Sequence, residues 1–115
     1  MTPESLSRAV LKALDELKAV DVRVLDVRGL TSVTDYMIIA SGRSYRQVRA
    51  MADKVVETAK SLKVQPVGVE GTQESEWILV DLGDVVAHLM HPTTRAYYQL
   101  EKLWMVEDQQ ATRRR

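Results

Sequence analysis

The sequence predicts an α/β (α+β) fold, a mixed five-stranded sheet with flanking helices in the order α-β-β-α-β-β-β-α. Two apolar stripes at helical spacing predict the first two helices, and short runs rich in β-branched residues predict the strands. A proline after the last run is typical of the first position of a helix and predicts the third. A single domain is expected over residues 1–106 of the 115, followed by a disordered polar tail over residues 107–115.

Each expected helix has a start signal. The first is predicted over residues 3–19, where Thr2 can act as the N-cap. Ser44 can cap the second helix, and the third is predicted over residues 92–104. The first two carry apolar stripes that consist of Leu6, Val10, Ala13, Leu14 and Leu17, and of Val48, Met51, Ala52, Val55, Ala59 and Leu62.

Two strands are expected between the first two helices. Residues 21–28 alternate between apolar and polar, and residues 34–41 are rich in β-forming side chains. Because they are close in sequence, they should pair antiparallel. A short strand is expected over residues 67–70, and the preceding Pro66 places it at an edge or a strand start, since proline cannot donate to a ladder. The helix before it permits a parallel crossover.

The segment from Glu76 to Pro92 is expected to form a hairpin that turns at Gly83-Asp84. One face of this hairpin is aliphatic and must be core: Leu82 opposite Val85, Val80 opposite Ala87, and Ile78 opposite Leu89. The other face pairs Trp77 with Met90, Leu79 with His88, and Asp81 with Val86. A large aromatic beside methionine, leucine and a few polar groups is typical of an anchor for another protein.

The alternative is that a helix of the chain covers this second face, which would make Trp77 an ordinary core residue. Asp81 and His88 favour the anchor, because a buried charge needs a partner. Tyr36, on the strand predicted over residues 34–41, can join the same patch or pack in the core, and both readings stay open.

No metal site is expected. His88 and His91 are three residues apart, which would suit a shared metal on a helix but places them on opposite faces of a strand. The chain has no cysteine, which excludes zinc-thiolate sites and thiol chemistry. His91, next to Pro92, is expected to satisfy the start of the last helix.

Ser41-Gly42-Arg43-Ser44, between a strand and a helix, could hold an anion on backbone amides and resembles the Gly-Ser turn of nucleotidyltransferases. Those enzymes need paired carboxylates on a nearby strand to hold magnesium. The strand predicted over residues 67–70 has only Glu70, while Asp81 and Asp84 straddle a turn. We therefore expect no enzyme activity and no cofactor, with a nucleotidyltransferase-like enzyme as the alternative.

Sixteen basic residues balance sixteen acidic ones, so no overall field favours nucleic acid or a membrane. Arg43, Arg46 and Arg49 can touch phosphates, although such residues more often form a solvated face. A minor contact to RNA stays open. The absence of cysteine and of a signal segment predicts a soluble, cytoplasmic protein.

Several motifs in matching order resemble the ribosomal silencing factor family, also called Iojap-like proteins, over about residues 5–105. They are Leu-Asp-Val-Arg-Gly, Thr-Asp-Tyr-Met-Ile-Ile-Ala-Ser-Gly, Val-Glu-Gly, Glu-Trp-Ile-Leu-Val-Asp-Leu-Gly-Asp-Val-Val-Ala-His and Tyr-Tyr-Gln-Leu-Glu-Lys-Leu-Trp. The resemblance implies a nucleotidyltransferase-like fold without catalytic carboxylates. It also implies binding to ribosomal protein fourteen of the large subunit, a block of subunit joining that represses translation under nutrient limitation, and a homodimer when free.

The family's Trp-x-Leu-x-Asp pattern implies partner contacts for Trp77, Leu79 and Asp81. Other candidate contacts are Asp35, Tyr36, His88, Met90 and Tyr98. Asp35 can instead fix the turn before its strand, and Tyr98 can instead pack the last helix. A plain homodimerisation module that uses the Trp77 face on itself is the remaining alternative.

Overall fold

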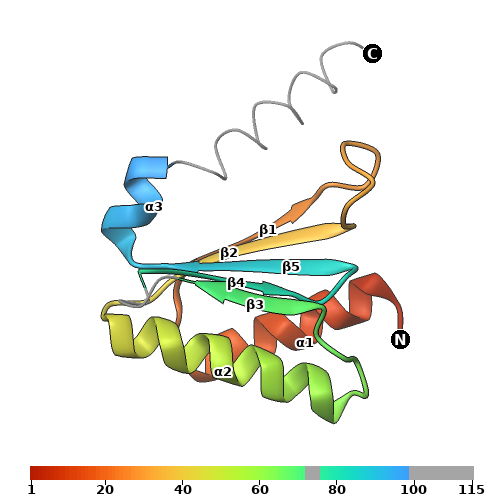
Figure 1. The fold of residues 1–115 in the computed structure, drawn as a ribbon, viewed down its shortest axis with the longest axis horizontal. Coiled ribbons are helices and arrows are strands. Elements are labelled where there is room, and N and C mark those ends of the chain that lie inside the picture. The colour runs from red at the N-terminus through yellow and green to blue at the C-terminus, as the bar shows by residue number, and fades with distance from the viewer. Residues whose placement is uncertain (72–75, 99–115) are drawn as a thin grey trace.

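The computed structural model describes residues 1–71 and 76–98, and the arrangement of its elements is drawn in Figure 1. The elements follow the predicted order. They are α1 (Pro3–Glu16), β1 (Val20–Asp26), β2 (Tyr36–Ser41), α2 (Tyr45–Ser61), β3 (Gly68–Gly71), β4 (Trp77–Asp81), β5 (Val85–Met90) and α3 (Pro92–Tyr98).

The five strands form one mixed sheet in the order β1-β2-β5-β4-β3. The expected antiparallel pairing of β1 with β2 is confirmed, β2 runs parallel to β5, and β5-β4-β3 is antiparallel throughout. β3 therefore points the same way as β2, as the crossover through α2 permits, but two strands separate them. The strand that follows Pro66 is an edge strand, which confirms the reading of that proline.

The hairpin of β4 and β5 has the predicted register. Trp77 lies opposite Met90, and the pairs continue without a shift to the end of β4. The turn is closed by the Leu82 N–H, which donates to the carbonyl oxygen of Val85 at 2.9 Å. Gly83 has φ of +89°, a conformation that glycine adopts without steric cost. Because side chains alternate along a strand, this register fixes which residues share each face.

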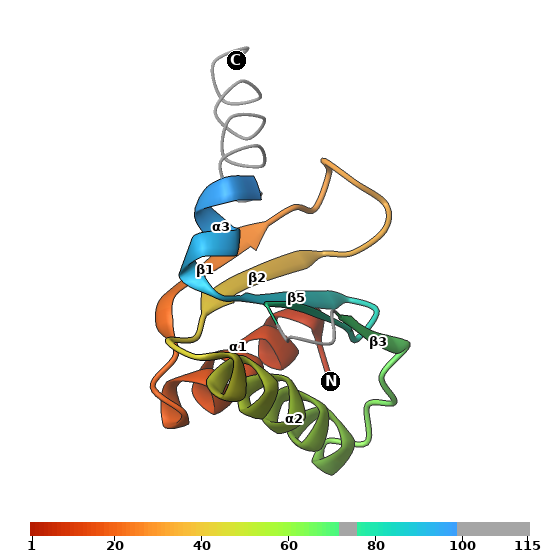
Figure 2. The ribbon, with the colours of Figure 1, turned by 60° about the vertical axis from the view of Figure 1, so that its left-hand side comes forward.

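Both long helices pack on the same face of the sheet, as Figures 1 and 2 show. The apolar stripes predicted for them meet the aliphatic face of the hairpin there. The main core is buried between these layers and comprises Leu6, Val10, Leu14, Tyr36, Ile38, Ala40, Val48, Met51, Ala52, Val55, Ala59, Ile78, Val80, Leu82, Val85, Ala87 and Leu89. Because this core lies on one side of the sheet, neither α1 nor α2 covers the second face.

The first helix is three residues shorter than predicted. It ends at Glu16 because Lys18 adopts the left-handed conformation with φ of 57°, and the Ala19 N–H then donates back to the Leu14 carbonyl at 3.0 Å. This is the C-terminal motif that glycine usually forms, and no glycine marks it here. The second long helix, α2, ends at Ser61 in the same way: Lys63 has φ of 62°, and the Val64 N–H donates back to the Ala59 carbonyl at 2.8 Å.

Both expected N-caps are confirmed. The Thr2 side chain accepts from the Ser5 N–H, and the Ser44 side chain accepts from the Gln47 N–H. The predicted continuation of the last helix to residue 104 and the tail over residues 107–115 lie outside the described residues. Within the described part of the chain, no helix is long and apolar enough to cross a membrane.

Candidate functional site

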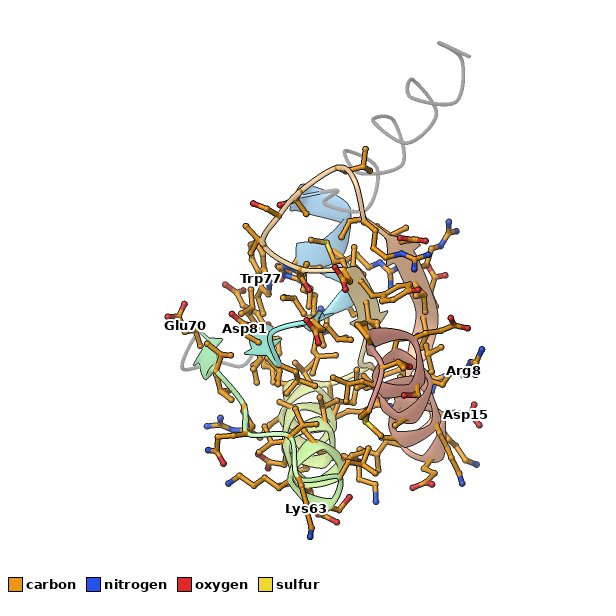
Figure 3. The ribbon with its side chains drawn as sticks, turned by 90° about the vertical axis from the view of Figure 1, so that its right-hand side faces the viewer. Arg8, Asp15, Lys63, Glu70, Trp77 and Asp81 are labelled. Carbon is orange, nitrogen blue, oxygen red and sulfur yellow. The ribbon has the colours of Figure 1, made fainter. Side chains whose placement is uncertain are left out.

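The second face of the sheet, opposite α1 and α2, is here called the open face. Its residues alternate with those of the main core along the strands: Arg23 and Leu25 of β1, Met37 and Ile39 of β2, Val86, His88 and Met90 of β5, Trp77, Leu79 and Asp81 of β4, and Glu70 of β3. Figure 3 places Trp77 on the side of the sheet away from α1, the helix that carries Arg8 and Asp15. The third helix, α3, lies at one end of this face (Figure 2).

A small second apolar cluster underlies the open face. Val27, Met37, Ile39 and Met90 are buried in it, and Leu25 and Trp77 pack against it half-exposed. Leu79 and Asp81, the other two residues of the Trp-x-Leu-x-Asp pattern, are also half-buried. The three residues therefore form an accessible strip along β4. α1 and α2 pack on the other face of the sheet, so neither of these two helices covers Trp77.

Trp77 is held in place by its neighbour on β5. Its indole Nε1–H donates to Nδ1 of His88 at 3.1 Å, and the two ring centroids are 5.8 Å apart at an interplanar angle of 48°. His88 exposes only 8% of its surface, and this burial lowers its pKa to about 4. The imidazole is therefore neutral near pH 7, with Nδ1 as acceptor, which fixes the tautomer and the orientation of the indole.

Asp81 has a structural contact as well as an accessible side chain. One carboxylate oxygen, Oδ1, accepts from the Gly83 N–H at 2.8 Å and so stabilises the hairpin turn. Glu70 is exposed on the adjacent strand. Two carboxylates therefore flank Leu79 at the β3 side of the open face, which favours a partner that brings cationic or N–H groups there.

The remaining predicted contact residues are placed differently. Tyr36, which the sequence leaves open, is 7% exposed and belongs to the main core, where the Arg28 guanidinium lies 5.2 Å from its ring centroid. Met90 is completely buried beneath Trp77.

The backbone of Asp35 is hydrogen-bonded on both sides: its carbonyl accepts from the Val27 N–H, and its N–H donates to the Asp84 carbonyl. This is expected of a residue that fixes the start of β2. Tyr98 ends α3, and its side chain lies outside the described part of the chain.

Arg95 is a buried residue at this site that the sequence analysis missed. Its guanidinium NH1 donates to the Asp21 carbonyl at 2.6 Å and to the Ser41 hydroxyl at 3.0 Å, and the side chain is 6% exposed. These bonds tie α3 to the ends of β1 and β2. Asp21 and Arg95 are 74 residues apart in sequence, so no local pattern signals the contact.

In the Ser41–Ser44 turn, the backbone N–H groups of Gly42 and Arg43 already have hydrogen-bond partners within the chain. The Gly42 N–H donates to the Met90 carbonyl at 3.1 Å, and the Arg43 N–H donates to Oε1 of Gln47 at 2.7 Å. A Cβ on Gly42 would lie 2.9 Å from a methyl carbon of Val48, so the glycine is required by packing against α2. The feature that suggested a nucleotide site is therefore explained by local structure.

Neither histidine is arranged to share a metal. His88 Nδ1 accepts from Trp77, while His91 Nδ1 lies 3.4 Å from the Thr93 N–H at the start of α3, the capping role predicted for it. Among residues 1–71 and 76–98, no group of three or more His, Asp or Glu side chains could hold a metal ion.

A comparison with protein families gives one match over the whole chain. The model described as "Ribosomal silencing factor during starvation" matches residues 1–115. A ribosomal silencing factor from Haemophilus influenzae is 45% identical over 87% of this chain and 98% of its own length. Another from Bacillus subtilis is 41% identical over 90% of this chain and 88% of its own length. A chloroplastic protein Iojap from Zea mays is 39% identical over 88% of this chain and 45% of its own length.

Solved structures share the same architecture. A crystal structure of a protein from Chromobacterium violaceum is 44% identical and superimposes with a TM-score of 0.88, covering 90% of this chain and 87% of its own. A second, from Bacillus halodurans, is 38% identical with a TM-score of 0.80, covering 88% and 94%. The mixed sheet with its flanking helices is therefore common to these proteins.

Proposed function

This chain belongs to the ribosomal silencing factor family, and we propose that it represses translation by binding ribosomal protein fourteen of the large subunit through its open face. The bound protein then occupies the surface on which the small subunit docks, so that the two subunits cannot join. The observation that carries the proposal is the half-buried strip of Trp77, Leu79 and Asp81 on the face that α1 and α2 leave uncovered.

The strip has the energetic features of a binding anchor. A tryptophan contributes a large apolar area with few rotatable bonds, so it loses little entropy when a partner covers it. The His88 hydrogen bond at 3.1 Å already fixes the indole, which lowers the ordering cost further. The buried Met37, Ile39 and Met90 form a firm base under the strip.

Polar groups at the margin of the strip would select the partner. Asp81 and Glu70 place negative charge beside Leu79 on a molecule of zero net charge. Local charge of this kind speeds the encounter with a basic surface and rejects an acidic one. A ribosomal protein, which sits among RNA phosphates, commonly offers basic side chains.

The mechanism requires only occupancy. A stable interface of standard size buries about 800 Å² on each partner. A body of 13.0 kDa held by such an interface is bulky enough to obstruct a second subunit. We assign no chemical step and no cofactor to the protein, and we place it in the cytoplasm, where ribosomes work.

We further propose that the free protein is a homodimer whose interface overlaps the open face. A half-buried tryptophan strip can be shielded from water by a second copy of the chain when the ribosomal partner is absent. The second copy and the ribosomal protein would then compete for the open face. As ribosomal protein is added, the heteromeric complex should replace the homodimer, and free monomer should not accumulate. A minor contact from Arg43, Arg46 and Arg49 to ribosomal RNA is compatible with their exposure in α2 and the turn before it.

Binding of the purified chain to isolated ribosomal protein fourteen, measured by interferometry, tests the proposal. The expected result is a saturable complex that is lost in Trp77→Ala and retained in Val24→Ala. Val24 is a suitable control because it is 38% exposed on β1 and points to the opposite side of the sheet from Leu25. Equal binding by both variants would reject the open face as the docking surface.

A further inference from the structure

The two edges of the sheet differ in how they are protected. At the β1 edge the register shifts between Val20 and Arg23, Asp21 has φ of 50°, and charged side chains alternate along the strand. Irregular backbone and charge are the features that keep an edge strand from pairing with another chain. One edge of the sheet is thus closed to further strands.

The β3 edge has a regular backbone and little charge. Its register with β4 is regular from Gly68 to Gly71, and Glu70 is its one charged residue. Val69 within the strand exposes 48% of its surface and Val67 just before it exposes 70%. A Cβ added to Gly68 would meet nothing within 4 Å, so the open-face side of this strand position is unoccupied. An edge strand of regular register carries a row of backbone N–H and C=O groups that its sheet does not pair, and this row is a template for one more strand.

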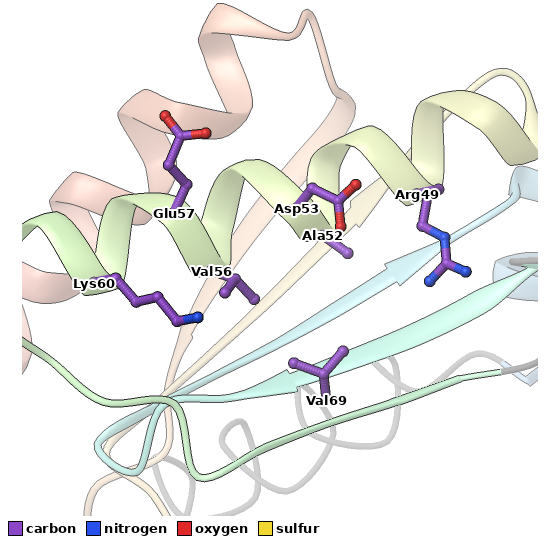
Figure 4. A pocket seen from close by; sticks show the side chains of 7 residues that line it. All are labelled: Arg49, Ala52, Asp53, Val56, Glu57, Lys60 and Val69. Carbon is purple, nitrogen blue, oxygen red and sulfur yellow. The ribbon is translucent and has the colours of Figure 1, made fainter.

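A hollow of about 440 Å³ lies along this edge on the helix side (Figure 4). Ala52 and Val56 of α2 and Val69 of β3 form its apolar floor, and the charged residues around it are Arg49, Asp53, Glu57 and Lys60. In Figure 4 the Arg49 side chain points from α2 toward the sheet and Glu57 points away from the sheet, while Lys60 extends beneath the helix. The hollow therefore has an apolar centre with the cations Arg49 and Lys60 at its two ends, and the acids Asp53 and Glu57 lie between these cations along α2.

A second hollow, of about 240 Å³, lies along the same edge on the open face. It is lined by Glu70, Gly71, Trp77 and Leu79. Hollows on both faces of one edge strand are what a sheet shows when the side chains of the next strand are missing, because an added strand points alternate side chains to either face.

We propose that β3 accepts an extended segment of a partner polypeptide as a sixth strand, and that this segment carries the pattern acidic-x-apolar-x-acidic on its helix-side face. The proposal goes beyond the ribosomal docking of the open face, since its main determinants lie on α2 and on the backbone of β3.

The spacing follows from the two regular geometries. Arg49 and Lys60 are separated by eleven residues of α2, or about 16 Å at the rise of an α-helix. Residues four apart on a strand are about 13 Å apart and point to the same face. The flexible Arg49 and Lys60 side chains cover the difference, and the apolar residue between the two acids then lies over Val56 and Val69. Among the described residues, neither cation forms an ion pair within the chain.

The test is a titration of the isotopically labelled protein with the heptapeptide Thr-Glu-Thr-Val-Thr-Glu-Thr, blocked at both ends, followed by amide chemical shifts. We expect shifts concentrated at residues 67–71 and along α2 between Arg49 and Lys60. The isomer Thr-Thr-Glu-Val-Glu-Thr-Thr has the same composition but puts its acids on the wrong face, and it should bind about tenfold more weakly. Methylation of the peptide's alternate amides should abolish binding, because those amides pair with β3.

A charge reversal makes the test specific to the hollow. The double variant Arg49→Glu, Lys60→Glu changes two exposed side chains of α2. The protein should therefore stay folded, as its amide spectrum will show. This variant should prefer Thr-Lys-Thr-Val-Thr-Lys-Thr over the acidic peptide. The proposal is overturned if the two isomers bind equally, if no shifts appear at millimolar peptide, or if the shifts lie around Trp77 alone. Residue 67–71 shifts that depend on protein concentration without peptide would also overturn it, because a second copy would then occupy the edge.

Discussion

The indole N–H of Trp77 donates to Nδ1 of His88 across the β4–β5 hairpin at 3.1 Å. One ring is half-exposed and the other is buried, so the hydrogen bond joins the candidate anchor to the interior of the sheet. The bond requires a neutral imidazole, and burial supplies that state by lowering the pKa of His88 to about 4. The orientation of the anchor therefore depends on the protonation state of a buried neighbour.

Stability should fall in mild acid because of His88. Its pKa is about 4 in the folded protein and 6.5 in the unfolded chain, so the unfolded chain binds a proton first as the pH decreases. The contribution of neutral His88 to the free energy of unfolding is complete above about pH 6.5 and is lost progressively as the pH decreases to about 4. Urea unfolding should show a loss of about 2 kcal/mol between pH 7 and pH 5 that is absent in His88→Gln. The same slope in both proteins would assign the effect to other groups.

Trp77→Ala should weaken binding to ribosomal protein fourteen by at least about 2 kcal/mol, or about 30-fold, because it removes a pre-oriented anchor. The affinity of Trp77→Phe should lie between those of Trp77→Ala and the wild type, since phenylalanine keeps an aromatic ring but lacks the N–H donor to His88. Titration calorimetry measures both. Loss of the folded state in Trp77→Ala at 25 °C would show instead that the indole serves mainly as core.

Asp81 offers a pair of variants that separate charge from turn geometry. Asp81→Asn keeps an oxygen that can accept from the Gly83 N–H, whereas Asp81→Arg removes that acceptor and reverses the charge. Both should slow association and flatten its dependence on salt, with the larger effect in Asp81→Arg. Stopped-flow binding at two ionic strengths checks this, and unchanged rates in both variants would remove Asp81 from the interface.

Gly42→Ala should destabilise the protein by about 1–3 kcal/mol, because the new Cβ would press on Val48 and on the sulfur of Met51. The same variant should leave binding to the ribosomal protein unchanged, since the turn lies away from the β4 strip. Urea unfolding together with calorimetry checks both halves. A variant with wild-type stability would contradict the packing explanation for the Ser41–Ser44 turn.

Much of this architecture follows from alternation and spacing. The hairpin register from Trp77 to Met90 was predictable because two-residue periodicity and one glycine turn leave few choices. The helix ends at Glu16 and Ser61 were not predictable, since the residues that follow them, Lys18 and Lys63, adopt a conformation that glycine usually adopts. Tyr36 was undecidable because its strand, β2, is buried on both faces. The Arg95–Asp21 contact and the parallel pairing of β2 with β5 join distant segments, and no local signal encodes them.

The central claim is that the protein acts through occupancy of the large subunit by its open face. Its most direct test is the sedimentation of purified large and small subunits after mixing with the wild-type chain, Trp77→Ala or Val24→Ala. The account predicts that the wild type and Val24→Ala co-sediment with the large subunit and keep the subunits apart, whereas Trp77→Ala leaves them free to join. Joined subunits in the presence of saturating wild-type protein, or a block that survives in folded Trp77→Ala, would contradict it.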